Sequence, residues 1–340
     1  SVDIGLPIFG VTDTTLLQSR AAIKTIFKEA GIVSTFSTHE SRNLTVLMDE
    51  ALDMMQENPD IGRWAIRLGF TQTDSSTAWF ESNEDFLNPN VDLGYLLKQS
   101  LHCVGNISTF LGQIKEVGAT IDAMPSHIHS FPTVSLFLTG DEIRIVGTFD
   151  RLYYAPFRFI SNFIPSVSVD HEELITLAKQ VGAILLRKKV IGYVMIDFLA
   201  FKEDEAIKIL GYDIRLNAYP SALFTAYMNL CCGYDPEKNK MLILNSVNCD
   251  ATSTASSSNT YRSGRYSTAP NGSRSSAKRF SVVHKCLTHP ALPVVSSKEL
   301  KKACFNGGLM FDLRNRTGFR IVFYDTPGEG KGFAFSSSIT

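Results

Sequence analysis

The amino-acid sequence predicts a mixed α/β (α+β) fold in which antiparallel sheets are flanked by helices. Apolar residues recur with helical spacing in several segments, and two pairs of apolar segments are joined by short polar turns, which is typical of β-hairpins. The composition agrees, because 44% of the 340 residues are hydrophobic and 20% are charged, close to the average of globular proteins. A wholly disordered chain, a collagen and a coiled coil are therefore excluded.

Helices are expected where apolar residues with helical spacing meet capping residues. The segment 16–30 (LLQSRAAIKTIFKEA) is amphipathic and stops before Gly31. The strongest candidate is 170–188, where Asp170 can cap the first turn and Lys188 suits the negative end of the helix dipole. The same signals predict helices at residues 43–57, 107–117, 222–232 and 298–305.

Two β-hairpins are expected in the middle of the chain. Residues 133–138 and 142–148 are joined by Gly140-Asp141, and residues 191–201 and 206–216 are joined by a polar turn. Single strands are expected at residues 64–68 and 319–324.

The segment 249–279 interrupts this pattern. It is rich in Ser and Thr, and from residue 251 to 278 it contains four basic residues and no acidic one. A segment with so few apolar residues cannot offset its chain entropy, so we expect a disordered insertion. It is either a solvated linker or a tether that is phosphorylated or binds an acidic partner.

Several classes of protein are disfavoured by charge and cysteine content. The 33 basic residues against 34 acidic ones give a net charge of −1, which does not favour a bulk nucleic-acid partner. No apolar run is long enough for a membrane span, and no signal peptide is expected. Because the chain opens with Ser1 rather than Met, we expect a fragment of a longer protein. The six cysteines match no zinc-site spacing, and we expect reduced cytosolic thiols.

One hairpin carries the residues that suggest chemistry. Asp197 lies in the middle of the apolar strand YVMIDFLAF, where a carboxylate needs a cation, a hydrogen-bonding partner or water. A turn near Asp204 would bring Asp213 on the returning strand within about two residues of facing Asp197. Two such carboxylates can form a Mg²⁺–phosphate site, because magnesium prefers oxygen ligands. The alternative is a buried pair of aspartate and arginine.

The run VIGYVMIDFLAF…ILGYDIRLNAYPSALFTAY resembles the C-terminal half of an ATP-grasp domain. Over most of its length, the chain resembles the ATP-grasp-like region of the IQ motif-containing protein H family. The stretches that carry this resemblance are GLPIFG, LLQSRAAIKTIFKEAGI, WAIRLGF, TFDRL, FISNFIPSVSVDHEEL, VIGYVMIDFLAF and HPALPVVSSKELKKACFNGGLMFDLRNRTG. It implies an ATP-grasp-like domain at 1–248 with a cleft between subdomains at about 1–130 and 131–248, and a C-terminal segment, 280–340, that packs on it.

The resemblance also implies a degenerate nucleotide site. Asp197 matches a magnesium-binding aspartate of active relatives, and Asp213 matches a second, glutamate ligand. Arg215 stands at the position of a metal-binding asparagine, and Asn217 at that of a phosphate-contacting arginine. Arg67 falls at the usual nucleotide-phosphate lysine.

These departures predict that metal-dependent ATP turnover is lost or very weak. Residues i, i+2 and i+4 share one face of a strand, so Asp213, Arg215 and Asn217 should point the same way. The guanidinium of Arg215 would then pair with a carboxylate and occupy the metal position. The expected glycine-rich flap is also missing, and only Gly69 remains. No cofactor is therefore expected, and ATP and Mg²⁺, with Asp197 and Asp213 as ligands, would apply only to an active site.

The resemblance implies a non-catalytic interaction or scaffold module of a ciliary or sperm-flagellar protein. The expected location is cytoplasmic, in the axoneme, with protein partners and no membrane partner. Calmodulin would bind only through regions outside this chain, because no IQ motif occurs in it. Two alternatives stay open: an active ATP- and Mg²⁺-dependent carboxylate–amine ligase, and a regulatory module that binds a nucleotide without turnover.

Weaker candidates lie elsewhere in the chain. His127 and His129 alternate and could ligate a metal, but surface histidines are the simpler expectation. Asp150 and Arg151 stand where active relatives have an Asp-Gln pair, so their role is open. Core packing rather than an adenine pocket is expected for the two tryptophans, Trp64 and Trp79.

Overall fold

The computed structural model of the chain describes residues 19–69, 76–88, 91–155, 157–216, 234–238, 240–241, 280–284, 295–308, 318–323 and 333–339. The helices are α2 (Arg20–Glu29), α3 (Leu44–Glu57), the 3-10 helix η2 (Glu84–Leu87), α4 (Leu93–Ser100), α5 (Ile107–Val117), α6 (His171–Arg187) and α8 (Ser297–Asn306). The strands are β1 (Arg63–Leu68), β2 (Thr77–Glu81), β3 (Ala119–Met124), β4 (Ile128–Ser130), β5 (Pro132–Leu138), β6 (Ile143–Ala155), β7 (Arg158–Ile164), β8 (Gly192–Glu203), β9 (Ala206–Arg215), β10 (Tyr234–Asp235), β11 (Lys240–Met241), β12 (Phe280–His284), β13 (Gly318–Phe323) and β14 (Phe333–Ile339).

A small antiparallel sheet with the strand order β2-β1-β3 is covered by α3, α4 and α5. Side chains alternate along β1, so Trp64, Ile66 and Leu68 enter the core beneath these helices. Ala65 and Arg67 therefore point to the opposite face, and Ala65 belongs to a second apolar cluster shared with β9. The small sheet thus has one face in its own core and one face toward the larger sheet.

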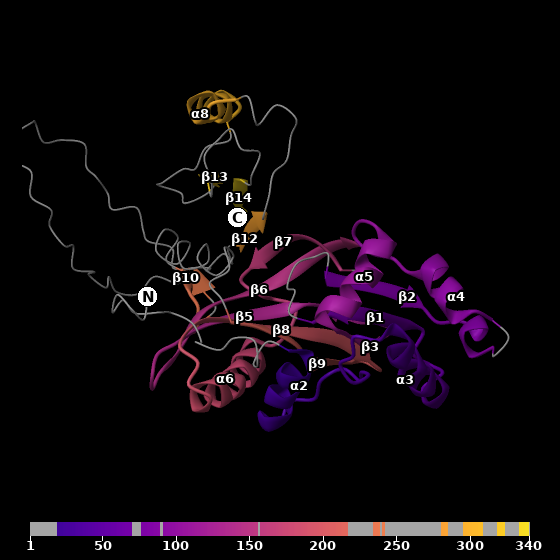
Figure 1. The fold of residues 1–340 in the computed structure, drawn as a ribbon. Helices are drawn as coiled ribbons and strands as arrows, with labels where there is room; N and C mark the ends of the chain where they lie inside the picture. Colours follow the sequence, from indigo (N-terminus) through magenta and orange to yellow (C-terminus); the bar gives the residue numbers. More distant parts are fainter. Residues whose placement is uncertain are drawn as a thin grey trace, which may run out of the picture.

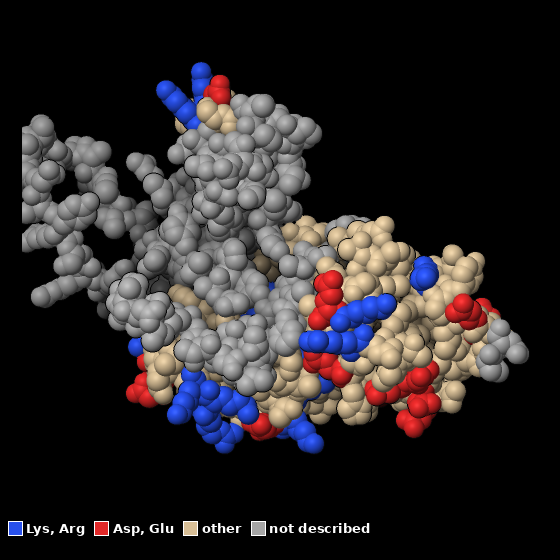
Figure 2. Space-filling model, viewed as in Figure 1, with Lys and Arg blue, Asp and Glu red and all other residues tan. Residues whose placement is uncertain are grey.

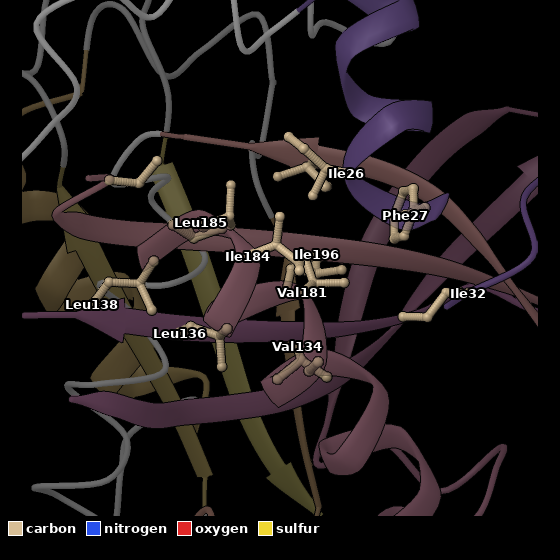
Figure 3. Close-up of a cluster of buried hydrophobic side chains, with 14 of the residues drawn as sticks. Ile26, Phe27, Ile32, Val134, Leu136, Leu138, Val181, Ile184, Leu185 and Ile196 are labelled. Atoms are coloured by element: carbon tan, nitrogen blue, oxygen red, sulfur yellow. The ribbon is translucent and has the colours of Figure 1, made fainter. Parts of the chain in front are cut away.

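The larger sheet has the order β13-β14-β12-β7-β6-β5-β8-β4, and β9 pairs with β8. Helices α2 and α6 lie side by side on one of its faces (Figure 1). Their apolar side chains pack against those of β5 and β8, where Phe27, Val134, Val181 and Ile196 are almost fully buried (Figure 3). Each such side chain contributes about 1.5–3 kcal/mol of transfer free energy. Helix α2, although it precedes the small sheet in sequence, is therefore held on the large sheet.

The segment after α2 ties the two sheets together. The amide of Gly211 on β9 donates to the carbonyl of Val33 at 2.8 Å, and the amide of Ala123 on β3 donates to the carbonyl of Phe36 at 2.8 Å. A few residues thus bond to both sheets and fix the distance between β3 and β9.

At Gly211, β9 packs closely against Phe27 of α2. A Cβ atom at this position would lie 2.4 Å from the ring of Phe27, which is 1% exposed and cannot turn away into solvent. We expect Gly211→Ala to lower the free energy of unfolding by about 1–3 kcal/mol, since overpacking forces a buried ring out of its rotamer. Chemical denaturation measures this loss. Gly112→Ala, in α5, meets nothing within 4 Å and should be neutral or stabilising.

Most elements expected from local signals are present. Asn43 caps α3, Asp170 caps α6, and Gly118 ends α5 with a φ of 76°. Both expected hairpins form, and so do the two single strands and the helix near residues 298–305, within a residue or two of the expected bounds apart from β6, which continues to Ala155. The helix expected at 16–30 is described from Arg20, with Ser19 as its cap.

Other elements were not predicted, namely β2, β3, β4, β7, β10, β11, β12, β14, α4 and η2. The helix expected at 222–232 and the insertion expected at 249–279 lie outside the described residues. Among the described residues, no helix is long and apolar enough to cross a membrane. The domain boundaries at about 130, 248 and 280 stay predictions.

Candidate functional site between the two sheets

The face of the small sheet that points toward the large sheet carries buried charges. Arg67 on β1 is 2% exposed, and Asp122 on the neighbouring strand β3 is fully buried. They lie on the same face because their strand neighbours Ile66 and Ile121 enter the core on the other side. Strand alternation therefore aims a cation and an anion at the large sheet.

The opposing face of the large sheet carries the hairpin aspartates. Asp197 on β8 lies directly opposite Asp213 on β9, and Asp204 forms the intervening turn with a φ of 56°. The next pair is Phe198 with Gly211, so Tyr212 is an extra residue that forms a β-bulge. The bulge lets Tyr212 join the cluster between the sheets while its neighbour Asp213 also points there.

Asp197 is 1% exposed and is surrounded by donors. The hydroxyl of Thr133 donates to one carboxylate oxygen at 2.8 Å. The other oxygen accepts from Arg151 at 3.2 Å and from Arg215, which pairs with Asp197 rather than with Asp213. Of the partners that the sequence left open for Asp197, the protein thus supplies two cations and a hydroxyl donor.

Asp213 is held by two further arginines. Its carboxylate oxygens lie 2.9 Å from a guanidinium nitrogen of Arg20 on α2 and 3.0 Å from one of Arg67. Burial would raise the pKa of Asp213, but the neighbouring guanidiniums of Arg20, Arg67 and Arg215 outweigh burial and lower that pKa to about 2. Asp213 is therefore ionised at neutral pH.

Arg67 joins the two sheets. It lies 3.1 Å from Asp122 on its own sheet, donates to the carbonyl of Tyr212 at 2.8 Å, and stacks with its guanidinium carbon 4.0 Å from the Tyr212 ring centre. Lys24 also reaches Asp122, at 3.3 Å. Burial opposes these charges, but the carboxylates and the tyrosine keep the pKa of Arg67 above its usual value. Burial lowers the pKa of Lys24 despite Asp122.

A Mg²⁺ ion does not fit this arrangement. Magnesium requires near-octahedral oxygen ligands at about 2.0–2.1 Å. Asp197 and Asp213 are the two carboxylates that face each other, and arginines contact both of them. In the described part of the chain, no group of three or more His, Cys, Asp or Glu residues could hold a metal. A dication that entered the site would have to displace these guanidiniums, and their positive charge would still repel it.

The structure brings together four of the five residues that the sequence predicts for the nucleotide site: Arg67, Asp197, Asp213 and Arg215. The fifth, Asn217, lies outside the described residues. The sequence did not point to Arg20 or Asp122, because their ion-pair partners are distant in sequence. Asp122 showed the same signal as Asp197, a carboxylate in the apolar segment ATIDAM, and could have been found by it.

The other residues that the sequence singled out lie in packed or exposed positions away from the paired aspartates. A Cβ at Gly69 would lie 2.2 Å from the carbonyl oxygen of Val117, so close packing of the backbone already requires glycine there. Trp64 enters the small-sheet core, whereas Trp79 stacks on His102 at 4.3 Å, so the two indoles line no common pocket. His127 and His129 are both exposed. Of the cysteines, Cys103 and Cys304 are described, and they are not bonded to each other.

Asp150 has a role that the sequence left open. It is 5% exposed and accepts hydrogen bonds from the hydroxyls of Ser166 at 2.7 Å and Ser168 at 2.6 Å. The amides of Val167 and Ser168 donate to its second oxygen at 2.9 and 3.2 Å. Because these four hydrogen bonds all come from residues 166–168, Asp150 fixes the segment that leads into α6.

We expect Asp150→Asn to lower the free energy of unfolding by about 2 kcal/mol. The amide keeps the size of the side chain, but one acceptor oxygen becomes a donor that faces the donating amides. Denaturant unfolding measures the loss. Asp141→Asn, at an exposed turn, is the matched control and should change stability by less than about 0.5 kcal/mol.

Comparison with known proteins supports the fold. The model of the IQCH-like ATP-grasp family matches residues 96–230. IQ motif-containing protein H of Danio rerio is 18% identical over 95% of this chain, which spans about a third (32%) of that relative. The resemblance to this family is thereby confirmed.

Two solved structures agree in architecture. The N5-carboxyaminoimidazole synthetase of Staphylococcus aureus, complexed with ADP, matches with a TM-score of 0.54 and 12% identity, over 99% of this chain and 71% of the synthetase. The biotin carboxylase domain of Hydrogenobacter thermophilus 2-oxoglutarate carboxylase, complexed with MgADP, matches with a TM-score of 0.57 and 11% identity, over 99% and 65%. The chain has an ATP-grasp-like fold. At 11–12% sequence identity, the likeness to these two structures shows the fold alone.

Proposed function

We propose that this chain is a degenerate ATP-grasp domain that acts as a non-catalytic interaction module. The observation that carries this proposal is the pairing of Arg215 and Arg151 with Asp197, at the position that the resemblance assigns to a metal ligand. The fold tolerates the replacement of a metal ion by arginines because each buried carboxylate has a guanidinium partner, and the ion pair compensates its charge.

The arginines argue against the ligase alternative. Catalysis of phosphoryl transfer requires a cation that neutralises developing charge while the phosphates remain mobile. Here the cations are fixed in ion pairs, and Arg67 is tied to Asp122, Asp213 and the Tyr212 carbonyl. A side chain with these three partners holds the sheets together rather than a substrate.

The proposed partners are proteins of a ciliary or sperm-flagellar assembly in the cytoplasm, by analogy with the family that the sequence resembles. Among the described residues in Figure 2, Lys and Arg lie in several separate groups, with Asp and Glu next to them. Such a face suits protein partners better than a bulk polyanion. Co-purification of the chain with axonemal extract, identified by mass spectrometry, would test this placement.

The test of lost metal binding is thermal unfolding with and without ATP, each with and without Mg²⁺. The parent chain should show the same midpoint in all four conditions. The variant Arg215→Asn/Asn217→Arg restores the family residues at both positions and should gain stabilisation by Mg-ATP. Arg144→Asn, in an exposed hairpin, serves as the control. Stabilisation of the parent by Mg-ATP would favour the ligase, and stabilisation by ATP alone would favour a regulatory nucleotide site.

A further inference from the structure

The C-terminal half of α6 carries an exposed basic surface. Beyond its acidic first turn, α6 has no Asp or Glu, and Lys179, Arg187 and Lys189 at its exposed side and end all face solvent. Lys188 lies 3.0 Å from Glu29 of α2, whereas the other three cations form no ion pair with a described residue. Their charge is therefore available to a partner.

Helix α3 carries the opposite charge. Asp49, Asp53 and Glu57 follow one another at intervals of four residues, so they share one face of the helix, and all three are exposed. The helix contains no Lys or Arg, and none of the three carboxylates forms an ion pair with any residue that the structure describes. Like charges at this spacing repel one another, so a basic partner would relieve the repulsion.

An apolar surface lies between these two charged helices. In Figure 1, α6, α2 and α3 follow one another along the lower edge of the molecule, and Figure 2 shows a group of Lys and Arg over α6 and a group of Asp and Glu over α3. The segment after α2 passes from the large sheet to the small one, and its Val33 and Phe36 are 70% and 71% exposed. Two large apolar side chains in so short a segment are thus left to solvent.

A hollow beside Val33 can receive a large apolar side chain. It lies between α2 and the turn at 31–34, and its volume is about 460 Å³, within the range of about 300–1,000 Å³ that is typical of ligand pockets. Ile32 and Val33 form one side, and Lys24 and Lys28 of α2 form the other. Lys24 turns its ammonium group toward Asp122, so its aliphatic stem is left to line the hollow.

We propose that this surface joins two copies of the chain in a symmetric dimer. Because α6 covers the large sheet and α3 the small one, with α2 between them, the two charged helices do not meet within one molecule (Figure 1). A second copy turned by half a revolution brings α6 of each copy to α3 of the other. Phe36 of each copy then fills the hollow beside Val33 of the other.

Such a dimer has an apolar centre between two ionic contacts, which is the usual composition of a protein interface. The opposite charges decide which part of one copy meets which part of the other, and the apolar centre supplies affinity. The inference goes beyond the proposed function, because it does not depend on whether the domain binds a nucleotide.

Sedimentation velocity of the 340-residue chain over a range of protein concentrations tests the dimer. The parent should show a monomer–dimer equilibrium that weakens as the salt rises from about 0.1 M to about 1 M, since the Debye length falls from about 10 Å to about 3 Å. Lys179→Glu/Arg187→Glu and Asp49→Lys/Asp53→Lys should each raise the dissociation constant at least about tenfold, because like charges then face each other.

Combining the two charge reversals should restore association. Equal amounts of the two double variants should form a heterodimer, and the chain with all four substitutions should dimerise about as tightly as the parent. Lys98→Glu/Lys115→Glu, at exposed positions of α4 and α5, changes the net charge as much as Lys179→Glu/Arg187→Glu does and is the matched control. It should leave the dissociation constant unchanged within about twofold.

The apolar centre has a test of its own. Phe36→Ser should weaken the dimer about tenfold, because an apolar anchor is lost. The free energy of unfolding, extrapolated to a concentration at which the chain is monomeric, should stay the same, since the ring is 71% exposed. Circular dichroism of every variant shows that loss of the dimer is not loss of the fold.

Three results would overturn the inference: a parent that stays monomeric at every concentration and salt, a dimer that neither charge reversal weakens, or two reversed variants that stay monomeric when mixed. The first result would leave the charged faces for other proteins. Failure of the proposed function is a separate outcome, which would appear as stabilisation of the parent by Mg-ATP.

Discussion

Replacing Arg67 with glutamine is expected to lower the free energy of unfolding by about 3–5 kcal/mol. The guanidinium is 2% exposed and contacts Asp122, Asp213 and the Tyr212 carbonyl. Its removal leaves fully buried Asp122 with Lys24 as its ion-pair partner, and Lys24 has a pKa that burial lowers. Urea or guanidinium unfolding, monitored by circular dichroism, gives the value.

This result separates a structural arginine from one kept for a ligand. A residue that serves only a ligand can be replaced with little loss of stability, since its charge is unsatisfied until the ligand binds. Arg63→Gln is the matched control, because Arg63 lies on the same strand and pairs with Glu81 at 3.0 Å on the surface. That exposed pair should contribute less than about 1 kcal/mol. Equal, small losses in both variants would contradict the role assigned to Arg67.

Asp213→Asn is expected to lower the free energy of unfolding by a similar amount, about 3–5 kcal/mol, at neutral pH. The amide has the same shape but leaves Arg20 and Arg67, which lie 2.9 and 3.0 Å away, without the charge that they face. The loss should also depend on pH, which distinguishes it from a packing defect.

The sign follows from the pKa of Asp213, which is about 2 in the folded chain against an ordinary value of 3.8. A lowered folded-state pKa contributes stability that is complete above pH 3.8 and is lost as the pH falls through about 2. This contribution is about 2 kcal/mol. The stability difference between the parent and Asp213→Asn should therefore narrow between about pH 4 and pH 2. A constant difference over this range would show that the pairing is not what stabilises Asp213.

Local signals were sufficient for much of the fold. Asn43 and Asp170 marked helix starts because capping is a short-range interaction, and the polar turn at Asp204 fixed the register that brings Asp197 opposite Asp213. Strand β3 was missed although Thr120 and Asp122 alternate with apolar neighbours, because two of those neighbours are alanines, which are uncommon in strands.

The site was predictable only in part. The hairpin supplied Asp197, Asp213 and Arg215, but the arginine on α2 that contacts Asp213 is 193 positions away from it in the chain (213 minus 20). The bulge at Tyr212, which turns that residue toward Arg67, is a consequence of strand pairing and has no local signature here. Long-range ion pairs depend on how sheets stack, which local patterns do not encode.

The most direct test of the central claim, that arginines have replaced the metal in this ATP-grasp-like fold, is a calorimetric titration of Mg-ATP into the 340-residue chain. The ion pairs of Asp197 with Arg151 and Arg215 predict no saturable heat. A single saturable site that requires Mg²⁺, accompanied by formation of ADP, would contradict the claim and identify the domain as an active enzyme.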